Sequence, residues 1–433
     1  MVIQMVKGNV KINKKEARTV EDGKIVKDLP TVNYDGKLLP LFSVISPSRC
    51  EKCNSKLYKN KTRKRYILSS YGTIEILVNY WRCSNDGCNS FYTDDIVGVT
   101  GSNNYSDEYL DKLFYTRYES KTSLFNTGRA AEILTGDIDE DNRAACPATL
   151  WKYEQKKGKI SLSKLRQKDV PFNGTLYCDG YWIKDGWKKF IENNLGRELK
   201  GSEWKRLRHK VIYVIATADK VILDFKITDI RPPYFALIPL FSRVKKRLGV
   251  DNIEKIVSDE DSAIINAVSQ VLPDKQHCFC VFHQLKKLTR IYLDKFGTLN
   301  KIPKLDKIFY ETGKELIMAE NAVTSTAILN KLKKLIKKDL SRTSKKAMKY
   351  LKDKYKKNRK LLEKDFLPET NNVMEQLFSF INDFVFQVRS FKTLSGLKNW
   401  ASNLFQTWNE REYNTGKFAG LSPLDISRLL KPG

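Results

Sequence analysis

Residues 253–283 read IEKIVSDEDSAIINAVSQVLPDKQHCFCVFH, and this stretch decides the fold class. Its apolar residues predict a strand over 253–258, a helix over 263–272 that ends at Pro273, and a strand over 276–282. A strand, a helix and a second strand in direct succession are typical of an α/β domain.

The residues before this stretch extend the pattern. A short buried strand is expected over 175–179, so that Asp179 ends it. Two further strands are expected over 211–217 and 221–227, joined by a tight turn at Ala218-Asp219-Lys220. An amphipathic helix is expected over 234–248.

The residues after His283 are predicted to be helical and rich in lysine to about Phe366. A last helix is expected from Asn372 to about Val388, and further helical segments reach Trp408. The expected order is therefore three strands, a helix, a strand, a helix, a strand, a long helical stretch and a final helix.

Charge gives the first indication of function. The chain has 433 residues, more than the roughly 250–300 at which one core stops growing, so more than one domain is expected. Its 78 Lys and Arg exceed its 50 Asp and Glu by 28, which predicts a polyanionic partner, most often nucleic acid. The alternative is a lysine-rich, soluble surface from a biased genome. Residues 284–366 hold 24 basic and 9 acidic residues, so more than half of the excess lies there.

No apolar stretch is long enough to span a membrane, and the N-terminal residues lack the apolar core of a signal peptide. We therefore expect the protein in the cytoplasm or nucleoid, or in the nucleus of a eukaryotic source. The eight cysteines should then be reduced, so metal binding is favoured over disulfides.

Four of these cysteines form two pairs, Cys50-Glu-Lys-Cys53 and Cys83-Ser-Asn-Asp-Gly-Cys88, with 29 residues between them. Two such hooks joined by a β-hairpin can place four thiolates around Zn²⁺. Because four thiolates leave no open position, this zinc is expected to be structural. The alternative is that the cysteines are unpaired structural residues.

A helical block over 105–165 suggests DNA recognition. A first helix is expected to begin near Ser106, a second to cover 123–134, and a third to open at Pro147 and end near Gly158. This arrangement suits a helix-turn-helix whose last helix enters a major groove, with Trp151 and Lys152 as candidate DNA contacts. The alternative is an ordinary helical connector.

Three acidic residues are candidate metal ligands for phosphodiester chemistry. Asp179 and Asp259 follow expected strands, and Glu375 lies in the first turn of a late helix. Two-metal catalysis needs converging carboxylates that hold the ions about 3.5–4 Å apart. Each acid alone has a structural explanation, as a turn, cap or helix-dipole residue. Asp185 competes with Asp179, and Asp261 competes with Asp259.

The segment Phe279-Cys280-Val-Phe-His283 provides accessory candidates. A Cys and a His three residues apart could bind metal or orient an active-site group, and the chain has only three histidines. A structural histidine satisfied by hydrogen bonds is the alternative for His283.

The ordered set of these motifs resembles the Mutator-like and related insertion-sequence transposases of the Asp-Asp-Glu class. The matching stretches are Leu176-Tyr-Cys-Asp179-Gly, Val257-Ser-Asp259 to Val268, Leu272-Pro273, the CxxH block ending at His283, and Thr370-Asn-Asn-Val-Met-Glu375. The resemblance covers residues 174–408. Gln284-Leu-Lys-Lys departs from the family's basic residue and Asn after CxxH, although the basic character is kept.

This resemblance implies an RNase H-like α/β catalytic domain that carries Asp179, Asp259 and Glu375 as catalytic residues and as ligands of Mg²⁺ or Mn²⁺. It implies a helical insertion between the second and third acids. It also implies nicking at element ends, followed by strand transfer from the freed 3′-hydroxyl. An N-terminal zinc or helix-turn-helix region would recognise terminal inverted repeats.

We therefore predict a DNA transposase that acts on double-stranded DNA, both element ends and target, as a homodimer or higher oligomer. Arg389 and Lys392 are candidate phosphate contacts, or else an exposed helix end. The alternatives are a domesticated transposase that regulates without cleavage, and an RNase H-like nuclease or resolvase. The expected segments are an irregular start (1–45), a zinc region (46–104), a helix-turn-helix (105–168), the first part of the core (169–283), a basic helical insertion (284–366), and the final core helices with the tail (367–433).

Overall fold

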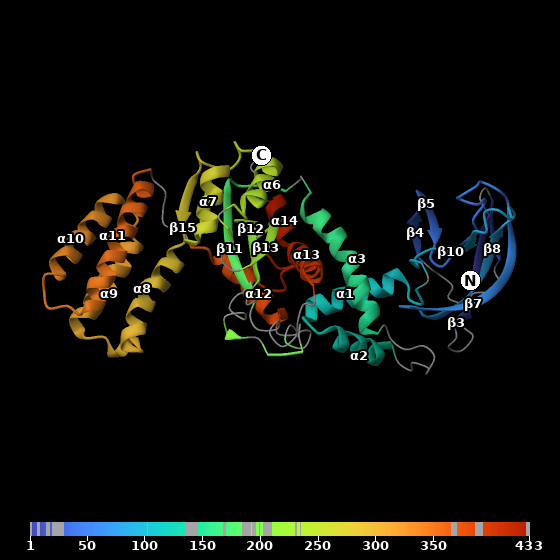
Figure 1. Ribbon diagram of the computed structural model, residues 1–433, viewed down its shortest axis with the longest axis horizontal. Coiled ribbons are helices and arrows are strands. Elements are labelled where there is room, and N and C mark those ends of the chain that lie inside the picture. Colours follow the sequence, from blue (N-terminus) through green and yellow to red (C-terminus); the bar gives the residue numbers. More distant parts are fainter. Residues whose placement is uncertain are drawn as a thin grey trace. The chain divides into compact units, whose positions relative to one another are not determined.

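The computed structural model divides the chain into two compact units, Met1–Lys156 and Lys157–Gly433, which are described separately (Figure 1). The structure describes residues 2–6, 9–13, 18–19, 30–101, 103–135, 146–167, 170–183, 192, 196–198, 200–201, 210–229, 232–233, 235–364, 370–385 and 393–429. None of its described helices is both long and apolar enough to cross a bilayer.

A five-stranded mixed sheet forms the centre of the second unit. Its order is β13-β12-β11-β14-β15, in which β11, β12 and β13 are antiparallel neighbours and β14 and β15 run parallel to β11. The strands are β11 (Thr175–Ile183), β12 (Lys210–Thr217), β13 (Ile222–Asp229), β14 (Lys255–Ser258) and β15 (Gln276–Phe279).

Helices cover both faces of this sheet, because alternate side chains of a strand point to opposite faces. On one face, Cys178 and Tyr213 join a buried cluster with α6 (Ile238–Leu248) and α7 (Ser262–Val271). On the other face, Tyr181 packs on α12 (Asn372–Val385) and Phe225 packs on α13 (Leu394–Glu410). The unit is thus a mixed α/β domain, and α14 (Pro423–Leu429) packs against α13.

A helical insertion follows β15 almost without a linker, since only Cys280 separates that strand from the next helix. Its helices bury a hydrophobic cluster of their own, in which Leu288, Phe309 and Leu351 are fully buried. The last of these helices returns to the edge strand β15. They are α8 (Val281–Phe296), η1 (Leu299–Lys301), α9 (Lys304–Ile317), α10 (Ala322–Leu335) and α11 (Arg342–Leu362).

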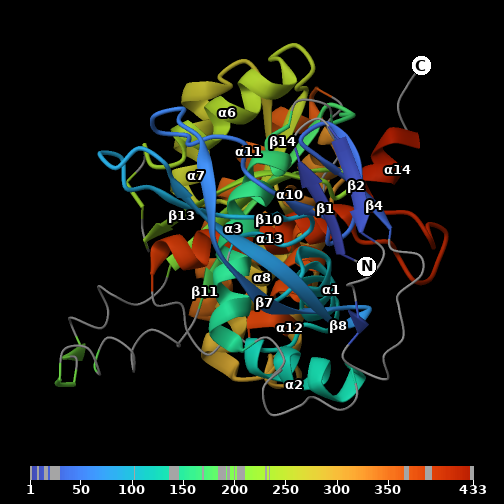
Figure 2. The ribbon, with the colours of Figure 1, turned by 90° about the vertical axis from the view of Figure 1, so that its right-hand side faces the viewer.

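The first unit contains a long β-hairpin of β7 (Leu57–Ser69) and β8 (Gly72–Cys83), which Figure 2 shows as its longest strands. Helices α1 (Asp107–Ser120), α2 (Leu124–Thr135) and α3 (Pro147–Leu165) follow, and α3 continues into the second unit. The other strands are β1 (Val2–Val6), β2 (Asn9–Asn13), β3 (Arg18–Thr19), β4 (Thr31–Tyr34), β5 (Lys37–Pro40), β6 (Val44–Ile45), β9 (Phe91–Thr93) and β10 (Asp95–Ile96).

Two expected element ends were wrong because tertiary packing overrides the local signal. Strand β11 continues past Asp179 to Ile183, since Gly180 has no Cβ that would crowd Val211 at 3.0 Å. Helix α3 does not end at Gly158. A Cβ there would lie 2.5 Å from that of Asn399 on α13, so this glycine permits close helix packing.

Two other boundaries also moved. The strand expected to reach residue 282 ends at Phe279, because α8 already begins at Val281. The helix expected from residue 234 begins at Ile238, with a proline in its first turn. Both shifts are only a few residues long, so the order of elements is as expected.

Candidate active site

Three acidic side chains reach one region of the sheet from three separate elements. Asp179 lies within β11, and Asp259 follows the last residue of β14. Because Cys178 pairs with Ser258 in the parallel register, the two aspartates come next to each other on neighbouring strands. Glu375 lies in the first turn of α12, which packs on β11 beyond Asp179.

The carboxyl group of Asp179 is buried, with 4% of the residue exposed. Its Oδ1 accepts a hydrogen bond of 2.7 Å from the Gly180 backbone, and its Oδ2 accepts one of 3.4 Å from Asn371 Nδ2. Burial raises the pKa of Asp179 well above its usual range, and the charges of Asp259 and Glu375 raise it further. A cation between these groups would remove that repulsion.

Asp259 is partly buried, and desolvation raises its pKa to about 6, with the charges of Asp261 and Glu260 adding to the effect. Its Oδ1 accepts a hydrogen bond from the Asp261 backbone at 3.0 Å. Asp261 itself has both oxygens occupied. Oδ1 caps α7 at the Ala263 backbone, and Oδ2 accepts from the Tyr213 hydroxyl at 2.8 Å. This cap role favours Asp259 over Asp261 as a metal ligand, whereas Asp185 lies outside the described residues.

Glu375 has an oxygen that suits a metal ion. Its Oε1 is buried and accepts no hydrogen bond from the described residues. Burial raises the pKa of Glu375, and the nearby Lys286 ammonium opposes that rise. Buried polar atoms without partners are rare in native proteins. His283 Nδ1 and Asn371 Oδ1 are likewise buried and have no hydrogen-bond partner among the described residues. The region around the three acids therefore has polar atoms that could bind a ligand.

The three acids do not form a compact ligand set of the kind that the cysteines form. Among the described residues, only a set of four cysteines brings three or more ligand atoms within 4.8 Å of one another. The three carboxyl groups are therefore more widely spaced than ligands of a single ion.

Cys280 and His283 border the acids from the start of α8. The Cys280 thiol is buried and accepts a hydrogen bond of 3.2 Å from the Asn371 backbone, which precedes α12. His283 Nε2 lies 4.0 Å from Asp179 Oδ2, and burial, followed by the charge of Lys286, lowers the pKa of this histidine. Asn371 was not singled out from the sequence, although it lies in the quoted Thr370-Asn-Asn string.

Residues 233–287 match the family model described as the MULE transposase domain. Over this segment the chain is similar to the Mutator-like transposases. The matched residues run from just before α6 into α8, and include Asp259, Cys280 and His283. Asp179 and Glu375 lie outside them. The match confirms the resemblance inferred from the motifs, and no curated protein matches the chain.

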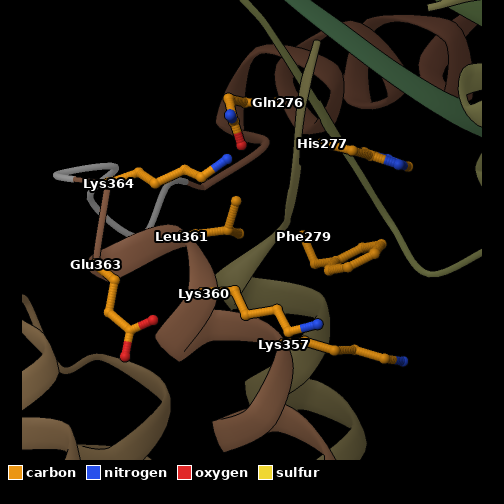
Figure 3. A pocket seen from close by; sticks show the side chains of 8 residues that line it. All are labelled: Gln276, His277, Phe279, Lys357, Lys360, Leu361, Glu363 and Lys364. Atoms are coloured by element: carbon orange, nitrogen blue, oxygen red, sulfur yellow. The ribbon is translucent and has the colours of Figure 1, made fainter. Parts of the chain in front are cut away.

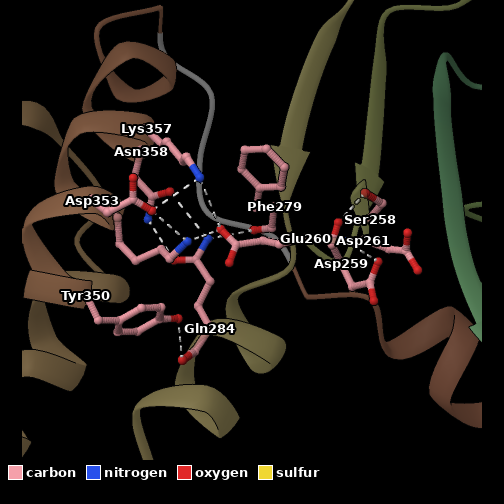
Figure 4. Close-up of polar contacts among 11 residues, drawn as sticks. Ser258, Asp259, Glu260, Asp261, Phe279, Gln284, Tyr350, Asp353, Lys357 and Asn358 are labelled. Carbon is pink, nitrogen blue, oxygen red and sulfur yellow. Dashed lines mark hydrogen bonds and ion pairs between the residues drawn. The ribbon is translucent and has the colours of Figure 1, made fainter. Parts of the chain in front are cut away.

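A polar cluster joins the loop that carries Asp259 to the helical insertion (Figure 4). Glu260 points toward α11, whereas Asp259 and Asp261 lie on the other side of the loop. Glu260 forms an ion pair with Lys354, which is 2% exposed. Beside it, Gln284 and Asn358 exchange side-chain hydrogen bonds, the two groups lying 3.2–3.4 Å apart.

A groove of about 640 Å³ lies next to this cluster, between the edge strand β15 and the end of α11 (Figure 3). None of the three acids lines it, so cavity size does not locate the candidate active site. Its lining is Gln276, His277, Phe279, Lys357, Lys360, Leu361, Glu363 and Lys364.

The first unit also contains a candidate metal site. The thiols of Cys50 and Cys88 lie 3.5 Å apart, those of Cys53 and Cys83 lie 3.4 Å apart, and all four gather within 4.8 Å. The Tyr92 hydroxyl lies 3.3 Å from Cys50 Sγ and lowers the pKa of that thiol to about 5. Four thiolates at this spacing could hold Zn²⁺ in a closed tetrahedral site.

The candidate DNA contacts are placed only in part. On α3, Trp151 is 47% exposed and Lys152 is also exposed, whereas the next two residues face inward. Glu154 accepts hydrogen bonds from Arg117 and Tyr118 on α1, which fixes the inner face of α3. Arg389 and Lys392 lie outside the described residues.

Proposed function

We propose that this chain is a DNA transposase of the Asp-Asp-Glu type, which binds the ends of a mobile element and cleaves and joins DNA. The observation that carries the proposal is the approach of Asp179, Asp259 and Glu375 to one another from β11, the end of β14 and α12. The pKa of Asp179 responds to both other acids, and a Glu375 oxygen is buried without a partner.

We also propose that the domain is RNase H-like. The sheet order β13-β12-β11-β14-β15, with three antiparallel strands followed by two parallel ones, supports this assignment. Helices on both faces, and an insertion between Asp259 and the helix of Glu375, agree with it. The match over residues 233–287 supports a transposase-related domain but does not reach the outer two acids.

In the proposed reaction, two bound Mg²⁺ or Mn²⁺ ions would activate the attacking water or 3′-hydroxyl and stabilise the leaving oxygen. Asp179, Asp259 and Glu375 would hold these ions. Asn371 and the Gly180 backbone orient the two oxygens of Asp179. Lys286, whose charge lowers the pKa of Glu375, would contact a backbone phosphate of the bound DNA.

The remaining parts of the proposal concern partners. Double-stranded DNA, as terminal inverted repeats and as target, would be held by the basic surface with a strong dependence on salt. A structural Zn²⁺ would be bound by the four cysteines of the first unit. Two copies or more are expected on DNA, because two element ends must be brought together.

The proposal is tested with Glu375→Gln and, as a matched control, Glu320→Gln on an exposed turn of the insertion. Labelled duplex DNA from the regions that flank the gene is incubated with Mn²⁺. The control should cleave and give joined products, whereas Glu375→Gln should bind this DNA and leave it uncut. A wild-type chain that binds but never cleaves would indicate a regulator, and cleavage without joined product would indicate a nuclease.

A further inference from the structure

The hairpin of the first unit has a strongly basic part, which we call the basic ribbon: residues 57–65 of β7 and the paired residues 76–83 of β8. Residues 57–65 read LYKNKTRKR and contain five Lys or Arg and no acid. The paired residues of β8 add Arg82 and no acid. This is a concentrated positive charge on two strands, at a distance along the chain from the helix-turn-helix candidate.

Within the ribbon, strand β7 is open to solvent on both faces, whereas Ile76 and Val78 of β8 are buried. Every residue from Tyr58 to Lys64 is exposed, although side chains alternate between the two faces of a strand. In a strand that covers a core, every second residue would be buried. β7 is also the edge strand of its sheet, so neither face nor outer edge of this part is used for packing. Exposed edges of this kind are available to a partner.

Both ends of the ribbon are nevertheless fixed. At one end, Leu57 pairs with Cys83, so the ribbon begins at the cysteine cluster. At the other end, Ile67 pairs with Ile74, and both belong to a buried hydrophobic cluster. The exposed cations are thus held on a strand pair clamped at two points, which lowers the entropy lost when a ligand binds.

Strand β8, which pairs with the strand that carries most of the cations, is also held in place by hydrogen bonds. Asp94 accepts hydrogen bonds from the backbone and side chain of Asn79 and from Trp81 Nε1, at 2.6–2.8 Å. Asn79 Oδ1 in turn accepts a hydrogen bond of 2.8 Å from the Thr62 hydroxyl on β7. These contacts connect the exposed strand to the folded part of the unit.

Three cations of the ribbon have neither a hydrogen bond nor an ion pair within the described part of the chain: Lys59, Lys61 and Arg63. Lys61 and Arg63 lie over the ring of Tyr80, at 5.0 and 5.8 Å from its centroid. This contact orders the side chains without neutralising them. By contrast, Lys64 pairs with Glu75, Arg65 donates to the backbone oxygen of Asn103, and Arg82 donates to Asn89 Oδ1. Lys59, Lys61 and Arg63 are therefore the charges available to a ligand.

We infer that the basic ribbon docks on duplex DNA, with Lys59, Lys61 and Arg63 contacting its phosphates. The major groove of B-form DNA admits a two-stranded β-ribbon, whereas the major groove of A-form RNA is too deep and narrow for side chains to read. The choice of DNA among polyanions rests on the proposed function. The position of the ribbon in the first unit does not rest on that proposal. The ribbon would add a second contact surface beside the helix-turn-helix candidate.

The test neutralises the three cations in the full-length chain, as Lys59→Gln, Lys61→Gln and Arg63→Gln together. The control neutralises three exposed lysines of the insertion, Lys301, Lys304 and Lys307. Binding of a labelled DNA duplex of mixed sequence is measured by fluorescence anisotropy between about 50 and 200 mM salt. Thermal unfolding and zinc content verify that each variant is folded.

The ribbon variant should lose affinity on the order of 100-fold at about 0.1 M salt, and its log–log salt slope should be less steep by about 2.7, or about 0.9 per phosphate. The control should lose far less. Equal binding by the ribbon variant and the wild type, or an equal loss in the control, would overturn the inference. So would equal affinity of the wild type for duplex RNA. Metal-dependent cleavage by the same wild-type protein tests the proposed function separately.

Discussion

Lys354 on α11 and Glu260 in the loop after β14 form an ion pair whose ammonium group is almost completely buried. Glu260 directly follows Asp259, so the helical insertion is bonded to the residue next to a candidate metal ligand. Lys354 also lies 5.0 Å above the ring of Tyr350, and 3.1 Å from Asp353. The insertion therefore supports the acidic loop as well as carrying positive charge.

Lys354→Met should destabilise the second unit and lower cleavage, since it leaves Glu260 partly buried with a weaker partner. Removing one member of a buried pair costs about 3–5 kcal/mol, and we expect the lower value because Lys357 lies 3.9 Å from Glu260. Urea unfolding measures the change. The control is Lys357→Met, whose side chain is 42% exposed, and which should cost below about 1 kcal/mol. Equal costs for the two variants would contradict this account.

Asn371→Ala should weaken metal-dependent cleavage. The buried Asn371 amide donates to Asp179 Oδ2, and residues that orient metal ligands typically change metal affinity by about 10–100-fold when removed. The expected result is a rise of that size in the Mn²⁺ concentration that gives half-maximal cleavage. Asn372→Ala, at the exposed neighbouring position, is the matched control. An unchanged Mn²⁺ requirement in Asn371→Ala would exclude a positioning role.

The sequence predicted elements well where the signal is local. Helix α1 begins after the Ser106 cap, and α7 lies within one residue of the expected range, because caps and apolar periodicity are properties of neighbouring residues. The predicted ends of helices and strands were wrong where a contact with another element determines the end. Gly158 would end an isolated helix, yet in α3 it allows the close approach of Asn399.

In the candidate site, too, the residues could be predicted from the sequence but the contacts between them could not. Asp179, Asp259 and Glu375 could be proposed from their order in the chain, but their approach depends on the β11–β14 register and on the packing of α12. Contacts between residues far apart in sequence were not predicted. The Lys354–Glu260 pair spans 94 positions and the Asn371–Cys280 bond spans 91, and no local pattern marks either pair.

Cys50→Ser should abolish stoichiometric zinc binding, because one of four gathered thiols is lost. Zinc content of the purified chain is measured by mass spectrometry or a metal-sensitive dye. Cys146→Ser is the control, since that exposed thiol lies outside the cluster, and it should keep its zinc. We further expect Cys50→Ser to lose sequence-specific binding while nicking non-specific DNA. Full zinc retention in this variant would exclude the four-thiolate site.

A pH dependence is expected from His277, whose pKa is lowered to about 4 by burial. Its Nε2 lies 2.8 Å from the Ser258 hydroxyl, and its ring packs on Phe279. Because the folded state binds this proton more weakly than the unfolded chain, stability present above about pH 6.5 is lost as the pH falls toward 4.

The size of this effect follows from linkage: between about pH 7 and pH 5 the loss should be about 2 kcal/mol. Buried aspartates with raised pKa values act in the opposite sense, so the quantity to measure is the difference between the wild-type chain and His277→Gln in urea unfolding at each pH. The variant should lose less stability on acidification than the wild type. Parallel curves for the two proteins would show that His277 is protonated equally well in the folded state.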